Sequence, residues 1–390
     1  MIAALGHSED LDSADAIAEA LDQCAETLAG KTPQAGLLYA GIDHDHQALL
    51  DGIEARYPGI QLIGCTTHGE MSSGGFAEDS VVLMLFHSDR VQFRAGIGLN
   101  ARTNPDVAGQ AIAMALDGLD APVRLCVAFP DGVVSEGMVG IIRDGIIGAL
   151  GEALGPDVPV CGGMAGDQIR FSRTYQFFNG AVHSESMPVL LFAGPLDVAV
   201  GVASGWEPVG EDHRLTDMDG LVIAGIDGER PRDFWMRYFG SADLSGTRNY
   251  FAVYPDAGGG SEEFYLCGPS HFQENGSMVT MNPAVGGTRI RFADGTRDGV
   301  LNGATSSAAR ARKGYPVATP EAALVFSCAA RHMVLGTWVV QEVDRFQEQI
   351  GVDVPAIGFY TYGEICPLPS SPTPVHHVCT FVTVLIGEGA

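Results

Sequence analysis

The sequence predicts an α/β protein with two domains of layered sheets flanked by helices, built from three related β-α-β-loop-β units. The first observation is an internal repeat, because the nine residues from Ile63 to Met71 return as Ile357 to Ile365, with Ile, Gly, Thr, Gly and Glu in register. The second is that an apolar run and a segment with helical spacing precede each copy, and a further apolar run follows it. The third is size, since 390 residues, 46% of them hydrophobic, exceed one comfortable core and can bury two.

Each copy of the repeat is predicted to form a strand, an amphipathic helix and a second strand, followed by an irregular loop and a third strand. Residues 35–86 parallel residues 322–386, and a weaker copy lies between them, from Arg124 to Ala193, so that the three are numbered in chain order. Crossovers in β-α-β units are nearly always right-handed and predict sheets covered by helices. The sequence does not fix the direction of the third strand, so parallel and mixed sheets both stay open. The residues with helical spacing are Leu49, Leu50 and Ile53 in the first copy, Met138, Ile141, Ile142, Ile146, Leu150 and Leu154 in the second, and Val339, Val343, Phe346 and Ile350 in the third.

A polar stretch marks the predicted domain boundary. It runs from Glu211 to Asp217 and follows the apolar run from Val198 to Ala203. We therefore expect a first domain over residues 1–212 and a second over residues 213–390. Repeated units of this size pack on one another, so a ligand site is expected between them.

The chain is strongly acidic, with 48 Asp and Glu residues against 22 Lys and Arg residues and a formal net charge of −26. Such a field repels phosphate backbones and anionic lipid, so we expect no nucleic-acid partner and no membrane-surface partner. The N-terminus lacks a basic segment followed by a sustained apolar core, and no apolar run reaches membrane-spanning length. These features predict a cytoplasmic protein.

Eight cysteines lie mostly inside apolar runs and show no C-x-x-C spacing. In a cytoplasmic protein this pattern predicts reduced, buried thiols.

A Gly-acid pair follows the second strand of each copy: Gly69-Glu70, Gly166-Asp167 and Gly363-Glu364. In the weaker copy the pair stands one residue closer to its leading glycine. Glycine there permits positive φ or close backbone approach, and the carboxylate can accept hydrogen bonds from an ammonium group or from amides. Open α/β sheets bind ligands where strands leave the sheet, so we expect the ligand where these loops approach one another.

The surroundings of the last pair are the richest in candidate ligand contacts. Two tyrosines precede the acid, and an arginine ends the equivalent first strand. Tyrosine offers an apolar face with a polar tip, and arginine is the usual partner of a ligand carboxylate. A small zwitterion or carboxylate would suit the favoured contacts Glu364, Tyr362, Tyr360 and Arg331, with Asp167 and Glu70 as secondary contacts. Each has a structural alternative, in which the acids cap helices or face water and Arg331 pairs with a local acid.

Histidines leave a haem alternative open, although no cofactor is expected. Single candidates for an axial ligand are His332, His68 and His377. The Asp43-His44-Asp45-His46 run is predicted to be a helix cap and not a metal site, because no third ligand cluster accompanies it.

An enzymatic alternative is also open, although we expect a binding protein. The sequence has no G-x-S-x-G, H-E-x-x-H or C-x-x-C-H motif. Cys65 with His68 has nucleophile-base spacing, and convergence of Glu70, Asp167 and Glu364 would permit acid-base work.

These motifs resemble the FIST (F-box and intracellular signal transduction) sensory domain family, in both its N-terminal and C-terminal parts. The first half is similar through Leu62 to Glu70, Val160 to Asp167, Phe178 to Gly180 and Gly205 to Gly210. The second half is similar through Ile226 to Gly228, Phe326 to Arg331 and, most specifically, Gly358 to Ile365. The resemblance covers nearly the whole chain.

The resemblance implies a ligand-sensing module, with small molecules such as amino acids as proposed ligands. Some members are haemoproteins that respond to nitric oxide and modulate a partner histidine kinase. This sequence shows no kinase, receiver or cyclase segment, which implies a stand-alone sensor that signals in trans to a separate partner. It also has His376-His377 where many relatives carry a His-Asn pair before the last strand.

Overall fold

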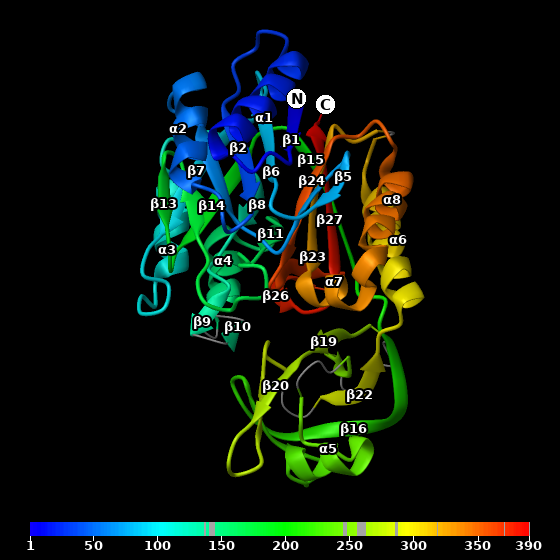
Figure 1. The fold of residues 1–390 in the computed structure, drawn as a ribbon. Coiled ribbons are helices and arrows are strands. Elements are labelled where there is room, and N and C mark those ends of the chain that lie inside the picture. Colours follow the sequence, from blue (N-terminus) through cyan, green and yellow to red (C-terminus); the bar gives the residue numbers. More distant parts are fainter. Residues whose placement is uncertain are drawn as a thin grey trace.

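The computed structural model describes residues 1–135, 138–139, 145–244, 248–255, 263–284, 288–317, 319–369 and 371–389. A large body contains three six-stranded sheets, and a smaller part below it contains a seven-stranded sheet (Figure 1). Helices cover the outer faces of the body. The mixed α/β architecture predicted from the repeat is confirmed.

Three units of related connectivity build the body, and we number them in chain order. Each contains an edge strand, a helix, two parallel strands joined by a helix, a hairpin and a returning strand. Unit 1 comprises β1 (Ile2–Ser8), α1 (Ser13–Leu28), β2 (Ala35–Ala40), α2 (His46–Arg56), β3 (Gln61–Thr66), β4 (Glu70–Ser72), β5 (Gly75–Ala77) and β6 (Val81–His87). Unit 2 comprises β7 (Gln92–Gly98), α3 (Val107–Leu116), β8 (Val123–Ala128), the short pair β9 (Val133–Ser135) and β10 (Met138–Val139), α4 (Ile146–Leu154), β11 (Val160–Gly163), β12 (Gln176–Phe178), β13 (Ala181–His183) and β14 (Met187–Ala193).

Unit 3 has the same order but is interrupted after its edge strand. It comprises β15 (Leu196–Ala203), α6 (Arg297–Gly314), β23 (Ala322–Cys328), α7 (Ala329–Leu335), the 3-10 turn η1 (Gly336–Trp338), α8 (Val339–Ile350), β24 (Ala356–Thr361), β25 (Glu364–Leu368), β26 (Ser371–His377) and β27 (Phe381–Glu388). The predicted helices of the first and third copies are present. In the second copy the helix begins only at Ile146, Met138 lies in a strand, and Ile141 and Ile142 lie outside the described residues.

The hairpin of each unit joins the sheet of a different unit. Strand β4 pairs with β24 of unit 3, β12 pairs with β3 of unit 1, and β25 pairs with β11 of unit 2. This cyclic exchange holds the three units together. All three pairings are antiparallel, so the sheets are mixed, an outcome that the sequence left open.

The interruption of unit 3 is an inserted part formed by residues 207–294. Its elements are β16 (Glu207–Asp219), β17 (Val222–Ile226), α5 (Pro231–Phe239), β18 (Tyr250–Tyr254), β19 (Tyr265–Cys267), β20 (Pro269–Phe272), β21 (Met278–Thr280) and β22 (Arg289–Asp294). Here the structure differs from the predicted boundary, because residue 212 falls inside β16 and strands from both predicted domains share sheets. The predicted boundary rested on the polarity of residues 211–217. Local polarity does not show that a hairpin of one unit pairs with the sheet of another.

The core of the body lies between the inner faces of the three sheets. Tyr39 comes from one sheet, Phe129 directly follows β8 of a second, and Phe326 and Phe359 come from the third; their ring centroids lie 4.5–6.1 Å apart. Strands such as β2 are buried on both faces, because the core covers one face and helices cover the other. All eight cysteines are buried and unpaired by disulfides, as predicted.

Within the described ranges, no helix combines the length and the apolar character needed to cross a membrane.

Candidate functional site

The three Gly-acid loops meet, which the sequence left open. His68 N donates to Tyr360 O at 3.0 Å, Gly166 N donates to Thr66 O at 2.8 Å, and Tyr362 N donates to Met164 O at 3.2 Å. Each bond links a loop of one unit to the strand end or loop of another, so the contacts run cyclically through all three units. This convergence places the predicted site residues close to the centre of the body.

The acids of two loops are bonded inside the protein. Ser80 donates to Glu70 Oε2 through its backbone N at 3.1 Å and its hydroxyl at 2.8 Å, and Thr67 Oγ1 donates to Oε1. Burial raises the pKa of Glu70 to about 7. Its carboxyl group therefore ties the start of the hairpin to the start of the returning strand.

We call this link between the first residue of the hairpin and the residue before the returning strand the joint. Glu364 forms the joint of unit 3. Thr380 donates to Oε2 through N at 3.0 Å and Oγ1 at 2.7 Å, and Thr361 Oγ1 donates to Oε1 at 2.7 Å. Glu364 is fully buried, and burial raises its pKa well above the ordinary value. Both oxygens are thus occupied by protein donors.

Asp167 is not the counterpart of these two acids, which corrects the repeat alignment. Its carboxylate accepts from the backbone N of Phe171, Ser172 and Arg173 at 2.7–3.0 Å and from the hydroxyl of Tyr362. It therefore orders the loop that follows it. Residues 164–175 separate β11 from β12, whereas only residues 67–69 separate β3 from β4, so Asp167 lies in the longer loop before the hairpin and not at its first residue.

The structural counterpart in unit 2 is Gln176, the first residue of β12. Its Oε1 accepts from Ser186 N at 3.2 Å and from Ser186 Oγ at 3.1 Å, just before the returning strand β14. A hydroxyl residue directly before each returning strand (Ser80, Ser186 and Thr380) was the sequence signal that could have identified it.

Arg331 and Tyr360 share a buried partner that the sequence did not indicate. Arg331 Nη2 and Nε lie 2.6 and 3.0 Å from Glu342 Oε1, and Tyr360 donates to Oε2 at 2.6 Å. Both Arg331 and Glu342 are 0% exposed. This is the structural alternative for Arg331, in which it pairs with an acid of its own chain.

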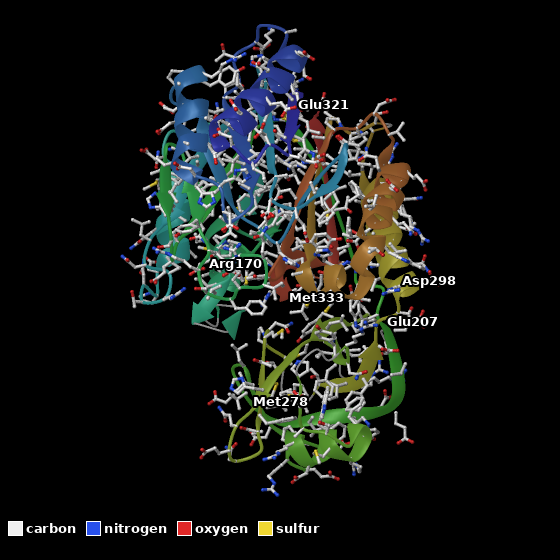
Figure 2. The ribbon with its side chains drawn as sticks, in the orientation of Figure 1. Arg170, Glu207, Met278, Asp298, Glu321 and Met333 are labelled. Atoms are coloured by element: carbon white, nitrogen blue, oxygen red, sulfur yellow. The ribbon has the colours of Figure 1, made fainter. Side chains whose placement is uncertain are left out.

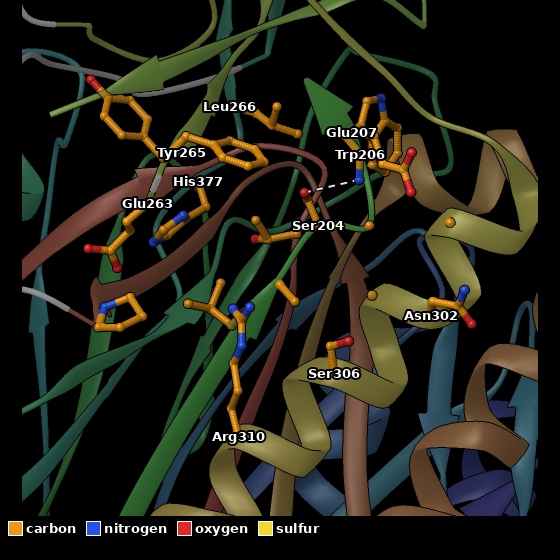
Figure 3. Close-up of a pocket in the computed structure, with 18 of the residues that line it drawn as sticks. Ser204, Trp206, Glu207, Glu263, Tyr265, Leu266, Asn302, Ser306, Arg310 and His377 are labelled. Carbon is orange, nitrogen blue, oxygen red and sulfur yellow. Dashed lines mark hydrogen bonds between the residues drawn. The ribbon is translucent and has the colours of Figure 1, made fainter. Parts of the chain in front are cut away.

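A cavity of about 370 Å³ lies between the body and the inserted part (Figure 3). One wall is α6, which presents Asn302, Ser306 and Arg310 at intervals of four residues. The other walls are the segment before and within β19, the connection from β15 to β16, and the end of β26 with the loop after it. Their lining residues include Glu263, Phe264, Tyr265, Leu266, Ser204, Trp206, Glu207, His377 and Thr380. The volume suits a small molecule.

Two of the favoured ligand contacts lie one layer behind this cavity. Arg331 donates to the carbonyl oxygens of Ser204 and, at 3.2 Å, Cys379, while Glu364 holds Thr380. The structure thus places them as supports of the lining and not as lining residues. Sequence reasoning missed the polar strip on α6, whose helical spacing could have revealed it.

The haem candidates fit a haem poorly. His68 Nε2 and His332 Nδ1 face each other at 3.0 Å, and neither residue lines the cavity. His377 does line it, and its Nε2 donates to Cys366 O at 3.1 Å, but charged side chains of Arg310 and Glu263 stand in the same walls. A porphyrin needs an axial ligand above an apolar slot, and these charged walls do not form one. Among the described residues, no group of three His, Cys, Asp or Glu side chains could hold a metal ion.

Cys65 is fully buried in the core of the body, and burial raises the pKa of its thiol well above the ordinary value. A thiol in such surroundings is a poor nucleophile. The spacing to His68 therefore gives no reactive pair in this geometry.

Comparison with known proteins identifies the family. The FIST N domain matches residues 34–229, and the FIST C domain matches residues 233–367. The chain belongs to the FIST family. FIST domains are sensory domains of signal transduction.

Curated relatives of this FIST protein are distant. An uncharacterized protein of Methanocaldococcus jannaschii is 23% identical over 247 residues, which cover 60% of this chain and 45% of that protein. An uncharacterized protein of Mycobacterium tuberculosis is 25% identical over 242 residues, covering 58% and 57%. The chain thus spans about half the length of the curated relatives that it matches.

Solved structures offer only remote likenesses. A cyanuric acid hydrolase from A. caulinodans aligns with a TM-score of 0.39 and 9% identity over 100% of this chain and 99% of that one. A chorismatase aligns with a TM-score of 0.35 and 9% identity over 91% and 93%. Likenesses at this level say nothing about the activity of the FIST protein.

Proposed function

We propose that this FIST protein is an intracellular sensor that binds an amino acid or small carboxylate in the cavity between the body and the inserted part. Neither haem nor catalysis is part of the proposal. The observation that carries it is the lining, which combines a guanidinium at Arg310, carboxylates at Glu263 and Glu207, and hydroxyl and amide groups on α6. A zwitterion would pair its carboxylate with Arg310 and its ammonium with the acids.

His377 adds a directional contact to this lining. Because Nε2 donates to Cys366 O, the neutral ring leaves Nδ1 as an acceptor. Burial lowers the pKa of His377 to about 4, so the ring is neutral at pH 7. A ligand N–H or O–H group would suit it.

A site between two parts of a protein supports sensing, since a ligand that contacts both parts favours the arrangement in which both contacts form. We propose that this arrangement is passed to a partner such as a histidine kinase. The matched region covers only about half of each relative, so the relatives do not indicate a partner for this chain. The partner is therefore part of the proposal.

The test is a thermal-shift screen of the purified protein with the twenty standard amino acids, acetate, succinate and glutarate. For a compound that raises Tm, calorimetry should show at least ten-fold weaker binding to Arg310→Gln, because the guanidinium is lost. Arg312→Gln is the matched control, since Arg312 lies on the same helix, donates to Val317 O and does not line the cavity. Equal weakening by both variants, or no compound that raises Tm, would contradict the proposal.

A further inference from the structure

The chain crosses twice between the body and the inserted part, and the two crossings are interlocked. The outgoing crossing runs from Ser204 to Glu207, and the returning one runs from Gly295 into α6. Gly205 has φ +79°, and a Cβ there would lie 1.9 Å from Gly299 O. At Gly295 a Cβ would lie 2.3 Å from the Trp206 ring. Figure 2 labels Glu207 and Asp298, one from each crossing, at the junction of the two parts. Backbones packed this closely must move together.

Arg331 lies beneath both crossings and holds each of them. Its Nη1 donates to Ser204 O in the outgoing crossing, and its Nη2 donates to Val300 O at 2.6 Å in the first turns of α6. Nη1 also donates to Cys379 O at 3.2 Å, beside the cavity residue Thr380. One buried cation therefore gathers carbonyl groups from the three segments that border the cavity at its body side.

On the side away from the crossings, Arg331 contacts residues of the body. Glu342 on α8 pairs with the guanidinium and accepts hydrogen bonds from Tyr360 at 2.6 Å and Ser327 at 3.0 Å. The Tyr360 ring stacks on His332, with centroids 5.1 Å apart, and His332 meets His68 of unit 1. A displacement of the crossings would therefore also displace α8 and the Gly-acid loops.

We infer that Arg331 is a positioning residue that couples the orientation of the inserted part to α8. Each N–H group of the buried guanidinium has an acceptor. If the inserted part moved, a carbonyl group would be displaced and would leave an N–H group unsatisfied, so few intermediate orientations are stable. Arg331 therefore selects discrete orientations of the inserted part. The link to a ligand rests on the proposed function, but the mechanical coupling does not.

The experiment measures the separation of the two parts in the ligand-free protein by double electron–electron resonance. Spin labels are attached through Glu348→Cys on α8 and Arg232→Cys on α5, which are both exposed. The eight native cysteines are buried, so labelling favours the two new sites. The wild-type background should give one narrow distance distribution. Arg331→Lys keeps a cation opposite Glu342 but cannot reach all the carbonyl groups with its compact head, and should at least double the width.

Arg345→Lys is the matched control, because Arg345 joins α8 to Asn302 of α6 without contacting either crossing, and should leave the width unchanged. If Arg331→Lys fails to fold, Glu342→Gln replaces it, since removing the charge partner should broaden the distribution in the same direction. Widths equal to wild type in the folded variants would overturn the inference. A negative ligand screen with a broadened distribution would overturn the proposed function alone.

Discussion

Units 1 and 3 close their hairpins with a carboxyl group, whereas unit 2 closes its hairpin with an amide. Glu70 and Glu364 each accept a backbone N–H and a hydroxyl from the residue before the returning strand, and Gln176 Oε1 accepts the same pair from Ser186. The geometry of the joint therefore does not need a charge. Two of the acids that the repeat suggested as ligand contacts occupy positions that a neutral residue fills in the third unit.

Unit 2 still has a carboxylate in the joint, but from another segment. Gln176 Nε2 donates to Thr174 Oγ1 at 3.0 Å, and Thr174 donates in turn to Asp131 Oδ1. Asp131 Oδ2 lies 3.1 Å from Arg102. The amide thus acts as a relay to an acid that has its own cation, while Glu70 and Glu364 are held by hydroxyl and amide donors. The comparison shows that the hydrogen-bonded link to the residue before the returning strand is repeated in all three units, whereas the carboxyl group is not.

The largest expected effect is that of removing the joint. Glu364→Leu leaves the hydroxyl groups of Thr361 and Thr380 and one backbone N–H buried without their acceptor, so the free energy of unfolding should fall by about 4 kcal/mol. Urea denaturation measures this loss. Gln176→Leu is the matched change and should cost a similar amount. A loss below about 1 kcal/mol in both would mean that the joints contribute little.

Glu70 should make stability depend on pH, whereas its counterpart Gln176 carries an amide that does not titrate. Its folded pKa of about 7 lies above the ordinary 4.5, so between these values the folded protein holds a proton that the unfolded chain has lost. Its contribution is fully present below about pH 4.5 and is lost as pH rises through 7, by up to about 3 kcal/mol. Glu70→Gln should reduce the slope by this share, while Glu364, whose pKa is also raised by burial, keeps its own contribution. The check is urea denaturation from pH 5 to pH 8, and an unchanged slope in the variant would assign it to other groups.

Converting unit 2 to the pattern of the others should destabilise it by a smaller amount. In Gln176→Glu the Thr174 hydroxyl can serve only one of two carboxylates, and the new one lies in the same buried network as Asp131, so about 2 kcal/mol should be lost at pH 8. The loss should shrink at pH 5, where the new group is protonated. Thermal melting at the two pH values measures this. Equal melting temperatures of variant and wild type at pH 8 would show that Arg102 neutralises both acids.

Much of the body was predictable from the repeat, whereas the site was predictable only in part. The apolar runs and helical spacing from Leu49 to Ile53 and from Val339 to Ile350 fixed the β-α-β units, because burial of one helix face leaves a periodic trace in the sequence. The recurrence of the Gly-acid pair marked the three loops, but only the structure shows that they meet. The helical spacing of Asn302, Ser306 and Arg310 can be read from the sequence, but the inserted part that they face cannot, because no local pattern encodes its position.

The sequence by itself determined the family, the α/β class, the three units and the buried state of the cysteines, since these depend on local periodicity and on motifs of adjacent residues. Tertiary structure alone decided which sheet each hairpin joins, that residues 207–294 interrupt unit 3, and that Glu364 and Arg331 support the cavity from behind. The physical reason is that a buried polar side chain takes whichever partner the packing of distant segments brings within hydrogen-bond distance. Glu342, eleven residues from Arg331, and Ser204, 127 residues away, are equally its partners, and only the fold brings them together.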